Sequence, residues 1–479
     1  MSFTSHIFVF YFLPGLLFLC CLLPRRSNLV RNLFLLTASG VFYAWLSPWF
    51  VVLLSGVIVV NHVLSRLMAA SRGRRGRVAW LVVCVAVDVG ILGFFKYSAF
   101  LQSNLNEVLK AMGGGTVPLL RVVLPVGVSF YIFKTLSHAI DVYRGQSQPA
   151  RSVIDFALYV SFFPQLLSGP IQRYGTLDAK SEAISTFADQ VRGRRHSLEK
   201  LSRGIALFII GFSKKILLAE AVTKIADAAF AAEAPGTLDV WYGATAYAFG
   251  LYLDFSAYSE MAIGVGLMLG FECPRNFSAP YLAESITDFW RRWHISLSSW
   301  FRDYLYIPLG GNRGGSVRTI FNLVVVFLLC GLWHGANWTF IIWGGYHGLL
   351  LVLERLLGRK TVYESLPRAG RIAGTFALLV VGWVFFRADS LGETWRLLGI
   401  MFSWAPAQGG SVLVGAELYG RGQVIAMGLS ALLIFQGRQG FDWVKTLTWP
   451  KALVLLVLFA LSAATLFAQS FRTFLYFQF

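Results

Sequence analysis

The stretch that decides the fold is residues 320–353, IFNLVVVFLLCGLWHGANWTFIIWGGYHGLLLVL. It is apolar along most of its length, but Trp333-His334-Gly335-Ala336-Asn337-Trp338 interrupts its middle. Arg318 precedes the stretch and Arg355 follows it, and loops that carry Lys and Arg tend to remain in the cytoplasm. Both ends are therefore expected on the same side of a membrane. The pattern predicts a helix that enters the bilayer, a turn at Gly335 and Asn337, and a helix that returns.

The turn of this predicted hairpin carries His334. Sixteen residues separate it from Arg318, and a rise of about 1.5 Å per residue places the imidazole ~24 Å into the membrane. An ionisable side chain at that depth is costly, so it marks a candidate functional site. The alternative, a histidine that only forms a hydrogen bond between helices, stays open.

The composition outside this stretch also indicates a membrane protein. Of 479 residues, 56% are hydrophobic and only 14% are charged, although the net charge is +18. A soluble nucleic-acid-binding protein shares the basic excess but not the low charge content. Lys and Arg that collect in cytoplasmic loops explain the excess instead. We therefore expect no nucleic acid among the partners.

Apolar stretches recur along the whole chain, and each is a candidate membrane segment. They are residues 7–23, 33–46, 49–64, 78–95, 117–143, 154–167, 205–222, 240–269, 320–353, 372–386, 423–436 and 453–467. Several are too long or too short for one plain crossing, which favours broken or re-entrant helices. The prediction is an all-α polytopic membrane protein with about 11–12 membrane segments in a single domain, residues 1–479.

The basic residues predict an orientation. They follow the first apolar stretch (Arg25, Arg26, Arg31), the third (residues 66–77) and the sixth (residues 192–203), and these loops are expected in the cytoplasm. Residues 7–23 lack the layout of a signal peptide and are interpreted as a retained span. Alternation then places the N-terminus outside, together with a C-terminus that includes Arg472.

Residues 276–318 differ from the apolar stretches because they mix aromatic and charged side chains. This mixture is typical of amphipathic helices at a membrane interface. Trp290, Trp293 and Trp300 are expected at headgroup depth, with Arg291 and Arg292 reaching water. His294 lies in this segment, either as a solvated interface residue or as part of a site.

Other polar residues within apolar stretches are weaker candidates. Lys134, His138 and Asp141 have helical spacing and could form one buried network, whereas His347 is interpreted as a packing residue. Lys214 could neutralise an anionic ligand near the cytoplasmic face, or could extend to water. Asp254 fits a hydrated pathway or a contact between helices.

Searches for familiar catalytic motifs are negative. The sequence contains no GxSxG, HExxH or phosphate-binding GxxxxGK[ST] motif. Its five cysteines form no CxxC pair, and Cys330 with His334 supplies only two ligands at helical spacing. We therefore expect no metal site and no disulfide framework.

Several motifs together resemble the membrane-bound O-acyltransferase family, in particular a bacterial branch that acetylates alginate and cellulose. They are Asp254-Phe255-Ser256, Asn276-Phe277, residues 289–297 (FWRRWHISL), residues 303–311 (DYLYIPLGG), Trp333-His334-Gly335, residues 124–131 (LPVGVSFY), Phe163-Pro164-Gln165 and the closing residues 475–479 (LYFQF). The resemblance covers nearly the whole chain and is weakest over residues 391–423. Ala257 and Lys134 depart from the usual pattern, but neither histidine motif does.

This resemblance implies a ring of tilted and re-entrant helices with interfacial amphipathic helices, and a catalytic core at about residues 117–355. His334 matches the catalytic histidine of the family, and His294 matches a second histidine on the cytoplasmic side. Trp333, Asn337, Arg291, Arg292, Lys214 and Asp254 are expected to bind the substrate or the donor. A long polar and aromatic path is expected between the two histidines.

The predicted function is transfer of an acetyl group from cytoplasmic acetyl-CoA, a substrate and not a bound cofactor, to an exported polysaccharide such as alginate or cellulose. His334 would act as a general base or as a transient acyl acceptor. The resemblance also implies an inner-membrane location, contact with membrane lipids, and an exoplasmic SGNH or esterase-like partner that completes the transfer. The charge pattern described above predicts periplasmic termini.

Two alternatives remain open at the level of sequence. One is transfer of D-alanyl or another acyl group to a cell-wall polymer. The other is a non-catalytic transporter or assembly scaffold in which the two histidines stabilise the bundle.

Overall fold

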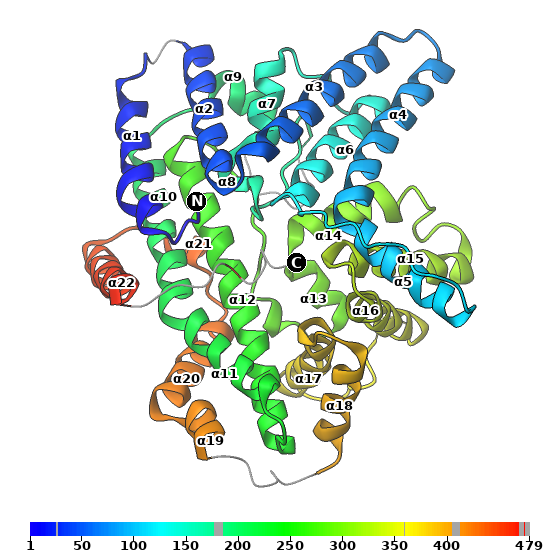
Figure 1. Cartoon of the computed structure of the whole chain (residues 1–479). Helices are drawn as coiled ribbons and strands as arrows, with labels where there is room; N and C mark the ends of the chain where they lie inside the picture. The colour runs from blue at the N-terminus through cyan, green and yellow to red at the C-terminus, as the bar shows by residue number, and fades with distance from the viewer. Residues whose placement is uncertain (25–26, 177–184, 359, 405–411, 469–473, 475–479) are drawn as a thin grey trace. The chain divides into compact units, whose positions relative to one another are not determined.

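The computed structural model describes the chain except residues 25–26, 177–184, 359, 405–411, 469–473 and 475–479 (Figure 1). All regular elements of the described part are helices, which confirms the all-α prediction. Arg25, Arg26, Arg472 and the closing motif at residues 475–479 lie outside the described residues. The chain divides into two compact units, Met1–Ile205 with Ala262–Pro274 and Ala206–Met261 with Arg275–Phe479. The single domain stays a prediction.

The first unit contains the N-terminal helices. In chain order they are η1 (Phe8–Phe12), α1 (Leu13–Leu22), α2 (Asn28–Leu46), α3 (Pro48–Ala70), α4 (Arg74–Leu92), η2 (Gly93–Tyr97), α5 (Ser98–Ala111), α6 (Val128–Arg144), α7 (Val153–Ser161), α8 (Phe163–Leu166) and α9 (Phe187–Gly193). Helices α3, α4 and α6 pack against one another, and α2 packs on α7. The boundary between the units runs through α10 (Leu198–Ser213) and α12 (Thr237–Met268).

Two predicted spans of the first unit are wrong in their extent. Residues 117–127 are not helical, and α6 begins only at Val128, after Gly127 with a φ of 76°. Pro118 and Pro125 lack the N–H that a helix interior needs, which explains the late start. The stretch 154–167 is likewise two helices, since the chain leaves helical geometry at Phe162 and α8 begins beside Pro164.

The second unit contains the remaining helices. They are η3 (Lys214–Ala219), α11 (Glu220–Ala231), η4 (Pro280–Leu282), α13 (Ile286–Arg292), α14 (Ile295–Phe301), η5 (Arg302–Tyr306), α15 (Gly315–His334), α16 (Trp338–Leu356), α17 (Arg368–Arg387), α18 (Leu391–Phe402), α19 (Val412–Tyr419), α20 (Arg421–Phe435), α21 (Gly440–Trp443) and α22 (Trp449–Ala468). Figure 1 shows α15 and α16 side by side, with α17 next to them.

Helices α15 and α16 form the predicted hairpin, and glycines explain how closely they pack. A Cβ atom on Gly331 would collide with the carbonyl oxygen of Phe340, and one on Gly344 would collide with that of Phe327. Small residues that let two backbones approach are a common device for helix association in membranes. The turn lies between His334 and Trp338, as the sequence predicts.

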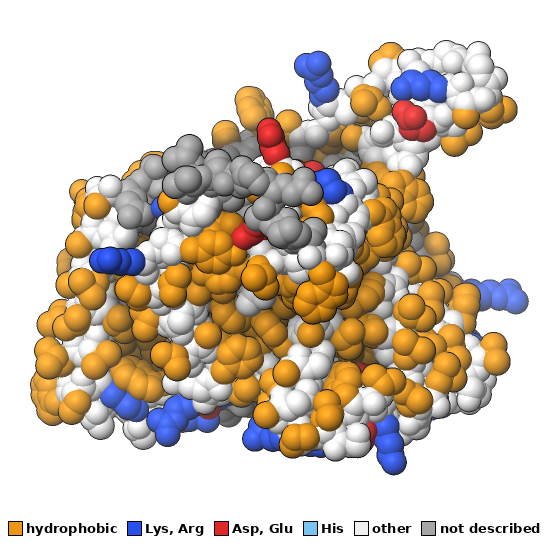
Figure 2. All heavy atoms as spheres, turned by 90° about the horizontal axis from the view of Figure 1, so that it is seen from below, with side chains coloured by type: hydrophobic (Ala, Val, Ile, Leu, Met, Phe, Trp, Pro, Cys, Tyr) orange, Lys and Arg blue, Asp and Glu red, His pale blue; other side chains and the backbone are white. Residues whose placement is uncertain are grey.

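Six helical segments of the described part are long and apolar enough to cross a membrane: α2, α3, residues 74–111, α15, α17 and α22. Residues 8–22 and α20 are apolar but shorter. Hydrophobic side chains dominate the face shown in Figure 2, as expected where lipid replaces water. The chain is therefore a multi-pass membrane protein, and the number of crossings stays a prediction.

The segment between α12 and α15 contains the short helices α13 and α14, in the region predicted to lie at the interface. Its tryptophans, however, do not present their rings to the surroundings. Trp290, Trp293 and Trp300 are all buried within the protein. Trp290 packs on Phe327 and Trp293 on Trp383. That these rings lie at headgroup depth stays a prediction. Arg291 is exposed, as predicted.

Candidate active site

His334 is the last residue of α15, at the turn of the hairpin. Gly335 continues the chain in an extended conformation, and Asn337 then caps α16 by accepting a hydrogen bond from the Thr339 N–H at 3.2 Å. The Asn337 side chain also donates to the carbonyl oxygen of Asp389 at 3.1 Å. Asn337, predicted as a ligand-binding residue, therefore holds the turn that positions His334.

Aromatic rings surround the imidazole of His334. The centroids of Trp333 and Trp343 each lie 5.0 Å from it, and that of Phe386 lies 5.2 Å away, all edge to face. His334 is only 4% exposed. Rings packed in this manner restrict the orientations of an imidazole and exclude bulk water. Trp343 and Phe386 come from α16 and α17, and local sequence around His334 contains no signal for either.

His294 lies between α13 and α14 in a backbone conformation that non-glycine residues seldom adopt, with a φ of 41°. It is 1% exposed, so the solvated alternative is wrong. Its Nδ1 lies 3.0 Å from Oδ1 of Asn276, and the same oxygen accepts hydrogen bonds from the Ser296 N–H at 3.3 Å and the Ser296 hydroxyl at 2.9 Å. Strain of this kind often accompanies a functional site.

The contacts of Asn276 determine the tautomer of His294. The Ser296 N–H can only donate, so the atom that it contacts is the amide oxygen. An amide oxygen can only accept, and Nδ1 of His294 must therefore carry the proton. The lone pair is left on Nε2. Burial also lowers the pKa of His294 to about 3, so the imidazole is neutral near neutral pH.

Trp333 contacts both histidines. Its ring centroid lies 5.0 Å from that of His334 and 6.3 Å from that of His294. The predicted long path between the histidines is therefore wrong, because both imidazoles lie next to the same indole ring. The ring centroid of Phe255, a residue of the Asp254-Phe255-Ser256 motif on α12, lies 4.7 Å from that of His294. Segments far apart in sequence thus meet at one buried cluster.

Lys214 and Asp254 are each bound to another charged side chain. Lys214 lies 2.7 Å from Glu260, and both side chains are about nine-tenths buried. Lys215 lies 2.7 Å from Asp254 and 2.6 Å from Glu220. The π-helical turn η3 directs both lysines toward carboxylates of α12. Asp254 therefore anchors Lys215, an arrangement that favours the contact between helices over the hydrated pathway.

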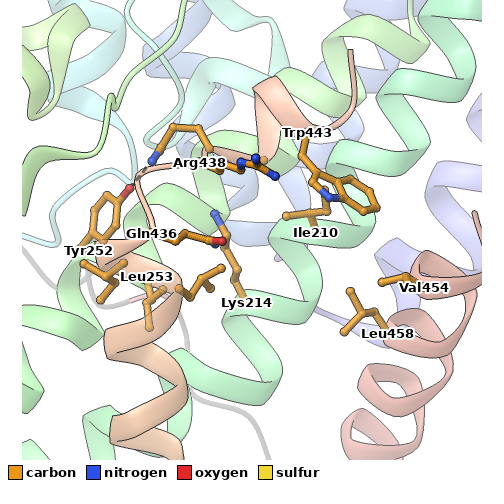
Figure 3. A pocket seen from close by; sticks show the side chains of 13 residues that line it. Ile210, Lys214, Tyr252, Leu253, Gln436, Arg438, Trp443, Val454 and Leu458 are labelled. Carbon is orange, nitrogen blue, oxygen red and sulfur yellow. Dashed lines mark hydrogen bonds between the residues drawn. The ribbon is translucent and has the colours of Figure 1, made fainter. Parts of the chain in front are cut away.

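Arg291 and Arg292, which are adjacent in sequence, have different surroundings. Arg292 donates to Asp288 at 2.9 Å within α13. Arg291 lines a cavity of ≈ 270 Å³ together with Arg355 and Asn312, at the ends of α15 and α16 away from His334. Lys214 lines a different cavity (Figure 3). The candidate donor-binding residues are thus distributed over separate places in the second unit.

The predicted network of Lys134, His138 and Asp141 is wrong. Lys134 donates to the Tyr159 carbonyl and to Gln165, each at 2.9 Å. Asp141 accepts from Thr176 at 2.9 Å, and His138 packs between the rings of Phe156 and Tyr174. These three side chains share α6 but have different neighbours, because helical spacing alone does not decide which helix each residue faces.

His347 is fully buried between Trp290 and Trp343, with ring centroids 5.2 and 5.1 Å away. The interpretation of His347 as a packing residue is confirmed. His347 nevertheless belongs to an aromatic cluster on α16 that includes Trp343, and Trp343 in turn contacts His334.

Known proteins provide an independent comparison. Residues 150–386 match the membrane-bound O-acyltransferase family. A protein of Pseudomonas putida named "Probable alginate O-acetylase" is 44% identical over the full length of both chains. A protein of the same name from Azotobacter vinelandii is 42% identical, again over both full lengths. The peptidoglycan O-acetyltransferase of Helicobacter pylori is 35% identical over 83% of this chain and 79% of its own.

Proposed function

Because the chain belongs to the membrane-bound O-acyltransferase family and is an O-acetyltransferase, we propose that it transfers acetyl groups in a reaction that depends on His334 and His294. As a membrane O-acyltransferase it acts on an exported polysaccharide. The observation that carries the proposal is the contact of Trp333 with both imidazoles, with His334 at the turn of the α15–α16 hairpin.

The donor in this proposal is cytoplasmic acetyl-CoA. His334 takes the proton from an acceptor hydroxyl, the oxygen attacks the thioester carbonyl carbon, the C–S bond breaks, and the proton leaves with the CoA thiol. A second route has the acetyl group on His334 first and on the hydroxyl afterwards. The proton on Nδ1 of His294 leaves the Nε2 lone pair to accept a proton or a hydrogen bond in either route.

The phosphates of acetyl-CoA need cationic partners. Arg291 and Arg355 line one cavity at the ends of α15 and α16, and the basic residues around that end favour the cytoplasm. Glu354 also lines this cavity, but its oxygens accept hydrogen bonds from the Ile286 and Thr287 N–H groups. We assign the phosphates to the pair of Arg291 and Arg355 before Lys214, because Lys214 is neutralised by Glu260. Arg292 is likewise bound to Asp288. This choice leaves Asp254 and Asn337 in positioning roles and Trp333 as a wall of the reaction site.

The acceptor is proposed to be an alginate-like or cellulose-like polymer, reached at the outer face of the inner membrane. The names of the relatives from Pseudomonas putida and Azotobacter vinelandii support alginate as the first polymer to test. We also propose periplasmic termini, and an exoplasmic esterase-like partner that completes the transfer to the polymer.

Acetate content of the exported polysaccharide tests the function. Strains with the native protein, His334→Ala or His294→Ala are compared at matched protein level. Loss of acetate in His334→Ala with normal protein level is expected. Unchanged acetate in His334→Ala contradicts the catalytic role, and loss of acetate only in step with loss of protein supports a scaffold instead. Analysis of the ester for D-alanine distinguishes the remaining alternative.

A further inference from the structure

A second cavity of the second unit has no part in the proposed reaction. Its volume is ≈ 280 Å³, and its walls come from α10, η3, α12, α20, α21 and α22 together with the connection between α20 and α21. Aliphatic side chains form one part of the lining: Ile210, Leu253, Leu433, Ile434, Val454 and Leu458. Figure 3 shows Val454 and Leu458 on α22, facing the cavity. This part of the cavity suits a hydrocarbon chain.

The other part of the lining is polar. Figure 3 shows the side chains of Lys214, Gln436 and Arg438 converging on one space. Tyr252 donates a hydrogen bond to the Gln439 side chain at 3.0 Å beside them. Guanidinium, ammonium and amide groups that point to one place form a typical environment for a phosphate. The cavity therefore combines an anion-binding end with an apolar end.

The charges around the polar end are predominantly positive. Carboxylates neutralise part of them: Glu260 lies 2.7 Å from Lys214, while Asp442 lies 2.7 Å from Arg275 and 3.0 Å from Lys445. Arg438 in the connection between α20 and α21, and Lys451 in the first turn of α22, add two further cations. The cations thus outnumber the carboxylates. An anionic ligand fits this environment better than a zwitterionic one.

The flanking helices place the cavity at the edge of the bilayer. Helix α22 is one of the segments able to cross a membrane, and its outward residues Leu453, Leu456 and Leu461 are more than half exposed. The connection before it carries Arg438 and Lys445, and Lys451 lies in its first turn, so the positive charges favour the cytoplasmic side. The polar end is then at headgroup depth of the cytoplasmic leaflet, and the aliphatic wall lies deeper.

We propose that this cavity binds an anionic phospholipid of the cytoplasmic leaflet. The phosphate lies against Arg438 and Gln436, beside the Lys214–Glu260 ion pair, and one acyl chain lies against Val454 and Leu458. Free phosphate shares the charge but leaves the aliphatic wall without a partner. The negative surface of the cytoplasmic leaflet attracts basic residues, and this attraction adds to the burial of the acyl chain.

Tyr252 links the lipid site to the histidine cluster. It lines the cavity, and its ring centroid lies 6.2 Å from that of Trp293 and 5.7 Å from that of Phe277. Phe277 in turn lies 6.4 Å from His294. A lipid in the cavity therefore touches a side chain that packs on the surroundings of His294. We expect bound lipid to stabilise this region, in addition to any effect on the rate.

The test measures lipid retained by the purified full-length protein. Native mass spectrometry counts phosphatidylglycerol and phosphatidylcholine after titration with short-chain forms of each. Phosphatidylglycerol is expected to bind, and Arg438→Gln and Leu458→Trp are each expected to weaken it about five- to tenfold. Lys445→Gln removes a charge from the same connection outside the lining, and Leu456→Trp alters the outward face of α22. Both controls are expected to bind as the native protein does.

Competition distinguishes a lipid from a soluble phosphate ligand. Inorganic phosphate and acetyl-CoA are expected to leave bound phosphatidylglycerol in place. If acetyl-CoA displaced bound phosphatidylglycerol, and the Arg438→Gln variant also had a raised KM for acetyl-CoA, the cavity would bind the donor. This result would overturn the proposal. Equal binding of both phospholipids by the native protein, or native binding by both Arg438→Gln and Leu458→Trp, would also overturn it. None of these measurements depends on the catalytic role of His334.

Discussion

The imidazole of His294 donates a hydrogen bond from Nδ1 to the side-chain oxygen of Asn276, at 3.0 Å. The two residues are eighteen positions apart, and Asn276 also accepts hydrogen bonds from Ser296, two residues after His294. Asn276 therefore holds the imidazole in one tautomer and one orientation. This relationship makes Asn276 a positioning residue for the second histidine of the site.

Replacement of Asn276 is expected to slow acetyl transfer. In Asn276→Ala the imidazole loses the acceptor for Nδ1–H, and we expect kcat to fall about tenfold, the equivalent of one hydrogen bond. Asn276→Asp keeps an acceptor oxygen and is expected to recover part of the rate. The rate is measured with labelled acetyl-CoA in vesicles. Ser296→Ala keeps the contact between Asn276 and His294 and serves as the control. If Ser296→Ala were as slow as Asn276→Ala, the role of Asn276 in positioning His294 would be contradicted.

Acid is expected to destabilise the protein partly through His294. Its pKa in the folded state is lowered to about 3 by burial, whereas an unfolded histidine titrates near 6.5. Between these pH values the unfolded state binds a proton on His294 and the folded state does not. The contribution of neutral His294 to the free energy of unfolding is therefore complete above pH ~6.5 and is lost as the pH falls toward 3. The loss is at most about 1.4 kcal/mol per pH unit.

Unfolding in detergent between neutral and mildly acidic pH measures this effect. The free energy of unfolding of the native protein is expected to decrease more steeply with acid than that of His294→Asn, which cannot titrate in this range. If the free energy of unfolding decreased with pH equally in the two proteins, His294 would not contribute to the acid sensitivity.

The hairpin of α15 and α16 is expected to tolerate no side chain at its closest contacts. Gly331→Ala places a methyl group against the carbonyl oxygen of Phe340, so the helices must separate. Overpacking of this kind costs about 1–3 kcal/mol. Gly345→Ala is a matched control, because its nearest neighbour would be a Leu328 methyl group at 3.5 Å. Thermal unfolding of the purified variants should separate the two; equal midpoints would contradict the packing argument.

Lys214 is expected to act through its ion pair with Glu260. Lys214→Met leaves Glu260 without its cation in a mostly buried position, and we expect a loss of about 3 kcal/mol in the free energy of unfolding. The double variant Lys214→Met with Glu260→Leu should recover much of that loss. If Lys214 instead bound the donor directly, Lys214→Met would raise the KM for acetyl-CoA while leaving stability unchanged.

Much of the architecture can be predicted from the sequence because it depends on local patterns. The apolar stretch with Gly335 and Asn337 at its centre predicts a helical hairpin, and the structure has one, with His334 at the turn. Basic residues at both ends of that stretch, and a high apolar content elsewhere, predict a multi-pass helical protein. The histidine motifs also carry the resemblance to the family that the comparisons then established.

The partners of the site residues could not be predicted in the same way. Helical spacing suggested a network for Lys134, His138 and Asp141, but those side chains have separate neighbours. The charge of Lys214 suggested an anionic ligand, but Glu260 from another helix neutralises it. The burial of Trp290 and Trp293 likewise depends on which helices cover them.

The sequence by itself determined the helical class, the hairpin and the two histidines, because chain geometry and hydrophobicity act over a few neighbouring residues. Only the tertiary structure decided that Trp333 contacts both His294 and His334, that Asn276 holds the tautomer of His294, and that Lys214 faces Glu260. These relationships join residues from different helices. They arise from how the helices pack, and periodicity along one helix contains no information about the side chains of the next.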